Sequence, residues 1–350
     1  MEAVQERHEN AILWRIAQLA VWLLGVSILG ALIFAPEIGI HAFWNILIPV
    51  APALLVIAPG IWRNVCPMAS TALLIRHMGW AKKKHLSTAW NDRLAFAGFL
   101  LLIAIIPLRH VVMDTNGPAT AIAITVLALI AFAVSYVFEW KSAWCSGLCP
   151  VHPVERLYGS RALLSTSNAH CQSCEHCVLL CPDSTPSLNP LTGARSKIRR
   201  LTGSLMAGGF AGFVYGWFQV PDYAGWAGWS HLGLAYAYPL GGFAMSLVLF
   251  LALTSRLSKS HKELVVRVFA CAAVSCYYWF RIPALFGFGV FPGDGMLVDL
   301  SNVVPSYFTI LSQILTTTFF VWILLLRPAQ PHPWAHRPQI ARPSRIRFAE

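Results

Sequence analysis

The chain has 350 residues, of which 57% are hydrophobic and only 12% are charged. Soluble domains carry about 25% charged residues, so this composition excludes a soluble globular protein and indicates a membrane protein. The formal net charge is +11, but no basic folded face with base-stacking partners accompanies it. We therefore expect no nucleic acid among the partners, and we expect contact with membrane lipid, whose anionic headgroups attract basic loops.

Eight apolar stretches are long enough to cross a bilayer, which takes about 20 residues each. The first ten residues contain three Glu and one Arg, and the apolar run after them is too long for the h-region of a secretory signal. The sequence thus predicts an all-α polytopic membrane protein with about eight transmembrane helices. The expected spans lie near 11–33, 43–62, 94–113, 118–139, 204–221, 233–254, 265–282 and 304–326.

The positions of Lys and Arg predict which loops face the cytoplasm, because basic loops stay on that side. Of the 26 basic residues, 24 lie in the N-terminal lead, in the loops 63–93 and 141–200, in the segment 256–267 or in the C-terminal tail. Arg109 and Arg281 lie at the opposite ends of their spans. This alternation predicts a multi-pass protein of a bacterial-type inner membrane, with both termini and the cysteine-rich loops in the cytoplasm.

Cysteine spacing gives the most specific signal in the chain. Cys171, Cys174, Cys177 and Cys181 read C-x-x-C-x-x-C-x-x-x-C-P, which is the spacing with which thiolates surround a 4Fe–4S cluster. Zinc sites usually use two separated C-x-x-C pairs, so a zinc knuckle, like a set of buried thiols, is the alternative. The loop that carries the run is expected in the cytoplasm, where thiols stay reduced, and this favours metal ligation over disulfides.

Two Cys-Pro pairs suggest an internal repeat. Cys66-Pro67 follows the second expected span, Cys149-Pro150 follows the fourth, and a short helix is predicted after each pair. Two spans, a Cys-Pro pair and a short helix therefore occur once in 11–79 and again in 94–159, although chance similarity of two dipeptides is the alternative. Pseudo-twofold packing of the copies would bring Cys66 and Cys149 close together beneath the membrane.

The number of ligands leaves the number of clusters open. In two-cluster ferredoxins the fourth cysteine of such a run binds the other cluster. Adding Cys66, Cys145 and Cys149 to the run gives seven thiolates for the eight positions of two clusters. Either one cluster is bound, or two are bound and another residue type completes the second. The candidates for that last ligand are His152, His170, His176 and Asp183.

Three histidines, His41, His110 and His231, are expected at the outer ends of spans. Two facing histidines could bind haem and a single one could bind a quinol, while an interfacial or packed histidine is the alternative. No apolar span carries a histidine at mid-length, so we expect no haem. Arg109 and His110, together with Asp114, form a candidate group for proton exchange beside a quinol, because ionisable residues at membrane depth are often functional.

Other small residues in the spans are read as packing residues. Gly208, Gly212 and Gly216 recur every fourth position, a spacing that lets two helices approach closely. Cys271 and Cys276 lie about 140° apart around one helix, so they are unsuited to share a ligand. We expect them to behave as small apolar residues.

With these motifs in view, the segment from about residue 10 to 185 resembles the NapH/NosR/CcoG-type membrane 4Fe–4S ferredoxin family. The resemblance rests on Cys66-Pro67, on Cys145–Pro150 and on Cys171–Pro182. It implies electron transfer through one or two 4Fe–4S clusters, between a quinone pool or cytoplasmic donor and a partner oxidoreductase or soluble electron carrier. A quinone is a further candidate cofactor.

These expectations divide the chain into four parts. Residues 1–140 form a paired-helix membrane repeat with its Cys-Pro motif, 141–200 a cytoplasmic ferredoxin-type region, 201–327 a second four-helix membrane region and 328–350 a disordered basic tail. The function expected is that of an electron-transfer subunit of an oxidoreductase. A cluster-based redox sensor or a metalloenzyme assembly factor without turnover is the alternative, and a transporter is disfavoured because charges at the bilayer midplane are missing.

Overall fold

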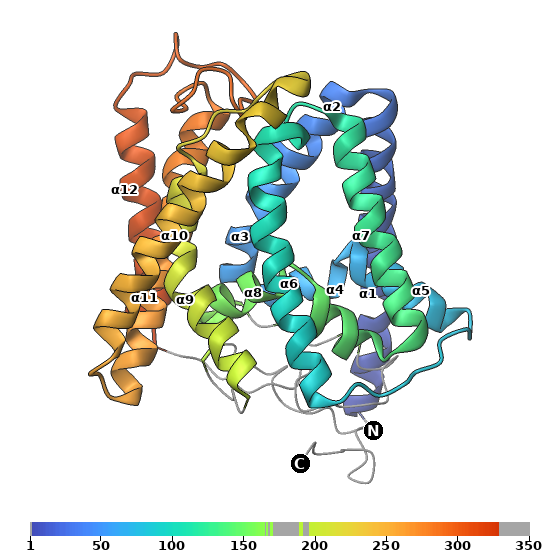
Figure 1. Cartoon of the computed structure of the whole chain (residues 1–350). Coiled ribbons are helices and arrows are strands. Elements are labelled where there is room, and N and C mark those ends of the chain that lie inside the picture. Colours follow the sequence, from blue (N-terminus) through green and yellow to red (C-terminus); the bar gives the residue numbers. More distant parts are fainter. Residues whose placement is uncertain (1, 165, 167–168, 171–188, 192–195, 329–350) are drawn as a thin grey trace.

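A computed structural model describes residues 2–164, 166, 169–170, 189–191 and 196–328. Long helices run side by side between two ends of a bundle, and short helices pack between them (Figure 1). Within the described residues, extended pairing is limited to an isolated bridge between Lys84 and Phe138. Seven of the described helices are long and apolar enough to cross a membrane. The chain is therefore an all-α multi-pass membrane protein, as its composition predicts.

The segment expected as the first copy of the repeat makes its return passage in several pieces. Helix α3 ends at Ile57, and Cys66 separates α4 from α5. Proline opens α2, α4 and α5, because its missing N–H costs nothing in the first turn of a helix. The elements are α1 (Glu2–Phe34), α2 (Pro36–Ile40), the π-helical η1 (His41–Leu47), α3 (Ile48–Ile57), α4 (Pro59–Val65) and α5 (Pro67–His77).

The segment expected as the second copy instead makes its return passage in one long helix, α7. Ser87 and Asn116 cap its two long helices, since each side chain accepts a hydrogen bond from a main-chain N–H in the first turn. The elements are α6 (Thr88–Leu108), the π-helical η2 (Arg109–Met113), α7 (Gly117–Val137), the π-helical η3 (Lys141–Leu148), α8 (His152–Tyr158) and η4 (Gly159–Arg161).

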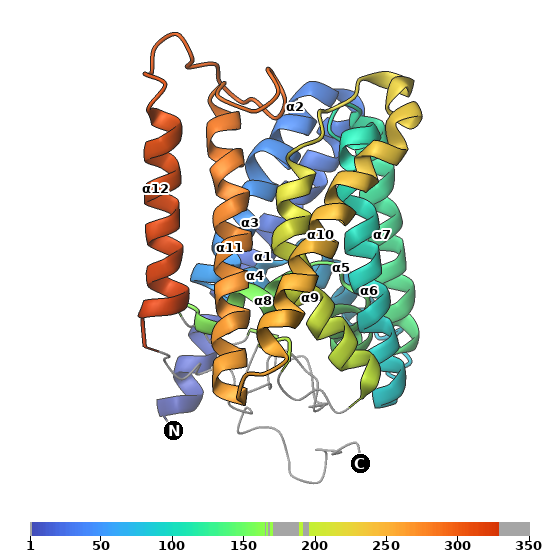
Figure 2. The same cartoon turned by 60° about the vertical axis from the view of Figure 1, so that its left-hand side comes forward.

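The remainder of the described chain contributes four more long helices, which pack on the repeat and on one another (Figure 2). Their buried aromatic side chains, among them Phe213, Phe250 and Tyr278, form the largest apolar core of the described residues. The elements are α9 (Lys197–Trp217), η6 (Gly225–His231), α10 (Leu232–Thr254), α11 (Lys259–Leu285), α12 (Phe308–Val321) and the π-helical η7 (Trp322–Leu326).

Helix α9, expected as the fifth span at 204–221, is absent from the seven helices that qualify by length and composition. It nevertheless runs along α10 between the same two ends of the bundle (Figure 2). A Cβ at Gly212 would overlap the carbonyl group of Gly242, and one at Gly216 would overlap the carbonyl group of Tyr238. The prediction that these glycines serve close helix packing is confirmed.

Many apolar side chains point outward from the bundle, where lipid would surround it. Ile122, Met245 and Val248 are 66%, 71% and 68% exposed, as expected for spans in contact with lipid. We call the end of the bundle that carries α5 and α8 the cysteine end, and the end that carries α2 and η6 the loop end (Figure 1). The described chain starts and finishes on the cysteine side, and α9 therefore supplies an eighth passage beside the seven qualifying helices.

Candidate functional site

Cys66 lies at the junction between α4 and α5, at the cysteine end. Its backbone leaves the helical region (φ −55°, ψ 119°) before Pro67 starts the next helix. Burial raises the pKa of the Cys66 thiol, and the main-chain N–H groups of Ala69 and Met68, which bond to the sulfur, counter part of that rise. The first Cys-Pro pair thus holds a half-buried thiol whose sulfur accepts hydrogen bonds from two amides.

Cys149 has the corresponding position in the second copy, between η3 and α8. Its backbone conformation is nearly the same (φ −62°, ψ 121°), and the main-chain N–H groups of Val151 and His152 bond to its sulfur. Burial raises the pKa of the Cys149 thiol to about 12, and negative charge on Cys66 adds to the rise. The two sulfurs therefore lie within electrostatic reach of each other, as pseudo-twofold packing of the copies would require.

Cys145 joins these two residues around a small apolar cluster. The cluster is centred on side chains of α5 and α7 and on Trp140 and Trp144, and Cys66, Cys145 and Cys149 pack against it. Cysteines from both copies of the repeat are thus gathered beside one apolar surface. Six of the expected ligands or ligand candidates lie outside the described residues: Cys171, Cys174, Cys177, Cys181, His176 and Asp183.

A buried ion pair connects the two cysteine-bearing segments. Arg63, in the last turn of α4, binds Glu155 of α8, and both side chains are 7% exposed. The other carboxylate oxygen of Glu155 lies 3.5 Å from Nδ1 of His152. Because carboxylate and guanidinium neutralise each other, the pair can stay buried and hold α4 against α8.

The structure describes two of the candidate histidine ligands, His152 and His170, and their hydrogen bonding differs. Burial lowers the pKa of His152 to about 4, so its imidazole is neutral at physiological pH. Nε2 of His152 is buried and has no hydrogen-bond partner among the described residues. Nε2 of His170 instead lies 2.9 Å from the carbonyl oxygen of Arg63. An imidazole with one nitrogen near a carboxylate and the other available is the usual arrangement of a metal-ligating histidine, and His152 has it.

A small pocket also lies near this end. It is lined by His152, Arg156 and Arg199, together with apolar atoms of Met206, and it has a cavity volume of about 40 Å³. Arg199 is held by Asp92 at 2.7 Å. The pocket offers polar hydrogen-bonding groups on an apolar background beside the Cys149 segment.

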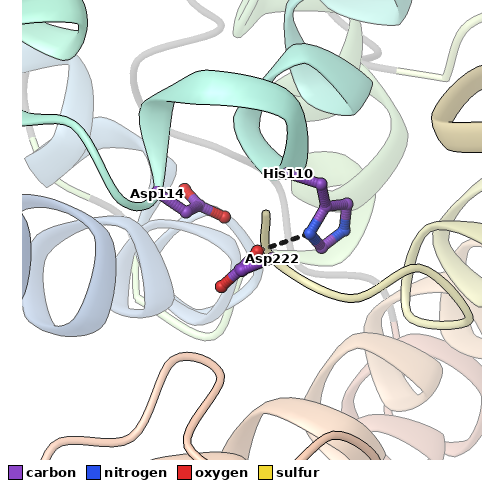
Figure 3. A group of neighbouring side chains, drawn as sticks. All are labelled: His110, Asp114 and Asp222. Atoms are coloured by element: carbon purple, nitrogen blue, oxygen red, sulfur yellow. Dashed lines mark hydrogen bonds and ion pairs between the residues drawn. The ribbon is translucent and has the colours of Figure 1, made fainter. Parts of the chain in front are cut away.

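A second group of ionisable side chains meets at the loop end (Figure 3). His110 belongs to η2, Asp114 follows that helix, and Asp222 follows α9. One ligand atom from each residue lies within 4.8 Å of the others. His110 and Asp222 are joined by a contact of 2.5 Å between Nδ1 and Oδ1. The sequence singled out His110 and Asp114, but it did not reveal Asp222, which no local pattern connects to them.

Charged groups surround this cluster. The Nε of Arg109 donates to Asp114 at 2.9 Å, and the Arg109 guanidinium lies over the rings of Trp44 and Trp217 at 4.0 and 4.7 Å. Asp294, from the loop after α11, accepts a hydrogen bond from the main-chain N–H of Asp222 at 2.7 Å.

The environment of the carboxylates opposes their ionisation. Burial raises the pKa of Asp222, and the charge of Asp114 adds to that rise. Burial also raises the pKa of Asp294 to about 6. A cavity of about 40 Å³ opens beside the cluster and is lined by His110, Asp114, Asp222 and Asp294, among other residues.

The other residues considered at the sequence level have separate neighbours. Nδ1 of His41 lies 2.8 Å from the amide nitrogen of Asn45, and the ring of His231 stacks on Tyr223 at 4.4 Å. Cys271 is buried in α11, with its sulfur 3.9 Å from the hydroxyl of Ser275. These contacts fit packing roles.

Comparisons with known proteins return nothing for this chain: no family model, no curated protein and no solved structure matches it.

Proposed function

We propose that this protein is a membrane-bound iron–sulfur protein that passes electrons between a quinone pool or a cytoplasmic donor and a partner oxidoreductase. One or two 4Fe–4S clusters would be held by the run Cys171, Cys174, Cys177 and Cys181 together with Cys66, Cys145 and Cys149. The proposal includes membership of the NapH/NosR/CcoG-type family, on the strength of the cysteine motifs.

The observation that carries the proposal is the matched setting of Cys66 and Cys149. Each cysteine is partly buried, its sulfur accepts two main-chain N–H bonds, and the two sulfurs lie within electrostatic reach of each other. Hydrogen bonds to sulfur and exclusion of solvent are two means by which proteins stabilise and tune an iron–sulfur cluster. Two neutral thiols in this position would leave the directed amides with weak acceptors, whereas thiolates bound to iron would use them fully.

The side chains around Cys66 and Cys149 suit an iron–sulfur cluster. A bound cluster would supply one-electron transfer, and the apolar surface with Trp140 and Trp144 would keep water from it. His152, with a buried Nε2 that lacks a partner among the described residues, would serve as the non-cysteine ligand if two clusters are bound. Seven thiolates and this imidazole would then supply the eight positions of two clusters.

The proposed orientation puts the cysteine end in the cytoplasm, since 24 of the 26 basic residues belong to segments expected on that side. The opposite end is about 30 Å away across the hydrocarbon core, which is far for one tunnelling step. If electrons enter and leave at the cysteine end, they need not cross this distance. The pocket beside His152, Arg156 and Arg199 is the proposed place for a quinone headgroup.

Anaerobic purification of the full chain tests the proposal. We expect iron and sulfide in near-equal amounts, at about four or eight per chain, and a new EPR signal after reduction by dithionite. Metal content dominated by zinc would reject the iron–sulfur assignment.

A second candidate, a redox sensor or assembly factor that does not turn over, is favoured by the ligand count, because a cluster with an incomplete cysteine shell is labile. Membranes containing the protein separate the two functions. Steady anaerobic quinol oxidation with an added electron acceptor, above the rate of membranes without the protein, supports electron transfer. A cluster that is reduced once without sustained flux supports the sensor.

A further inference from the structure

The orientation of the His110 ring follows from its contacts. Its Nε2 lies 3.0 Å from the carbonyl oxygen of Trp217, and a carbonyl oxygen can only accept, so Nε2 carries the hydrogen. The ring also stacks on the Trp217 indole at 4.4 Å, which fixes its plane. Nδ1 of the same ring faces Oδ1 of Asp222, 2.5 Å away.

A ring nitrogen and a carboxylate oxygen this close either share a proton or lie beside a metal cation. A histidine that donates one N–H to a main-chain carbonyl while the other nitrogen faces carboxylates has the second-shell arrangement of a metal ligand. Asp114 supplies the third ligand atom, within 4.8 Å of the other two. Bonds of about 2.0–2.2 Å to a common ion need ligand atoms roughly 3–3.5 Å apart, a distance that rotation of the two carboxylates can reach.

Charged side chains of both signs meet around the cluster. Arg109 and Arg281 face three carboxylates, those of Asp114, Asp222 and Asp294. The carboxylates outnumber the guanidinium groups, and a bound cation would favour their ionised form.

The two arginines also have partners outside this group of carboxylates. Arg109 binds Asp114 and lies on two indole rings. Nη2 of Arg281 donates to the carbonyl oxygen of Trp44 at 2.6 Å and to Oδ1 of Asn45 at 2.5 Å. The adjoining cavity of about 40 Å³ has room for the waters that would complete a coordination shell.

We propose that Nδ1 of His110 and carboxylate oxygens of Asp222 and Asp114 form a binding site for a divalent first-row cation, Zn²⁺ or Mn²⁺, at the loop end of the bundle. One imidazole and two carboxylates form a donor set that suits these ions. The bound ion would join η2, in the second copy of the repeat, to the loop that follows α9. This site is separate from the cysteines and does not depend on the proposed iron–sulfur function.

The test uses the full chain in detergent, treated with a chelator and dialysed against Zn²⁺ or Mn²⁺ alone. We expect about one ion per chain by elemental analysis, and binding at least tenfold weaker in Asp222→Asn and His110→Gln. His231→Gln is the matched control, because its ring stacks on Tyr223 at the same end. Iron is measured in the same samples. Loss of Zn²⁺ or Mn²⁺ binding in a variant that keeps its iron tests the cation site alone, and absence of iron from the wild-type chain tests the proposed iron–sulfur function alone.

A measurement on the unchanged protein covers the case in which the variants do not fold. Pulsed EPR of bound Mn²⁺ should show modulation from a directly coordinated histidine nitrogen, which ¹⁵N-histidine labelling would alter. The proposal is overturned if the wild-type chain binds neither ion, if Asp222→Asn binds as tightly as the wild type, or if the Mn²⁺ spectrum lacks a nitrogen coupling. In those cases a proton alone lies between His110 and Asp222.

Discussion

Arg63 and Glu155 form a buried ion pair between α4, which precedes Cys66, and α8, which follows Cys149. The pair connects the two copies of the repeat at the point where each presents a cysteine. Because 92 residues separate Arg63 from Glu155, no local sequence pattern predicts this tertiary contact. It makes the position of one sulfur depend on the segment that holds the other.

Replacing Glu155 by Gln should destabilise the protein strongly, since it leaves the Arg63 charge buried without its carboxylate. Breaking a buried pair from one side costs about 3–5 kcal/mol. The double variant Arg63→Met/Glu155→Leu should be less destabilised than Glu155→Gln. Thermal unfolding in detergent measures both, with the exposed Asp299→Asn as control, and equal unfolding temperatures for Glu155→Gln and wild type would contradict the role of the pair.

His152 should affect cluster content if it completes a second cluster. We expect His152→Ala to lower the iron per chain from about eight to about four, and His152→Cys to retain the higher value because a thiolate replaces the imidazole. His77→Ala, an exposed position at the end of α5, is the control. Full iron content in His152→Ala would remove His152 from the ligand set.

The hydroxyl of Tyr278 replaces a helical hydrogen bond in α3. It donates to the carbonyl oxygen of Pro49 at 2.5 Å and accepts from the main-chain N–H of Ala53 at 2.9 Å, so it takes the place of the direct 53-to-49 bond. Tyr278→Phe leaves both buried groups without this partner, which we expect to cost about 1–3 kcal/mol. Tyr307→Phe, at a side chain 65% exposed, should change the thermal unfolding little, and an equal effect of both variants would argue against the bridge.

Gly212 and Gly241 give a matched test of helix packing. A Cβ at Gly212 would overlap the carbonyl group of Gly242 on α10, whereas a Cβ at Gly241 would meet no atom within 4 Å. Gly212→Ala should therefore separate α9 from α10 and destabilise by about 1–3 kcal/mol. Gly241→Ala should be neutral or slightly stabilising, because alanine favours a helix. Similar unfolding temperatures for the two variants would show that the packing of α9 on α10 does not depend on the close contact at Gly212.

Local patterns predicted most of the architecture. Apolar runs located the seven qualifying spans, and the fourfold glycine spacing predicted the close contact along α9. The mean hydropathy of α9 is too low for a typical span, because glycines and basic residues lower it. Packing against its neighbours nevertheless keeps α9 in the bundle. The Cys-Pro pairs predicted a short helix after each pair: α5 begins at Pro67 itself, and α8 begins two residues after Pro150.

The groups that complete each site could not be predicted in this way. Asp222 meets His110 across 112 residues, and both Asp222 and Asp294 lie in connecting loops that have no periodicity. The pairing of Arg63 with Glu155 likewise depends on how the two copies pack. Sequence can identify residues with suitable chemistry, but long-range contacts decide which of them meet.

The most direct test of the central claim compares iron in three cysteine variants purified without oxygen. Cys66→Ser and Cys149→Ser each remove a sulfur that we assign to a cluster, while Cys271→Ser changes a cysteine packed within α11. The account predicts that the first two variants lose much of their iron and sulfide and that Cys271→Ser keeps the wild-type amount. Unchanged iron in both Cys66→Ser and Cys149→Ser would contradict it.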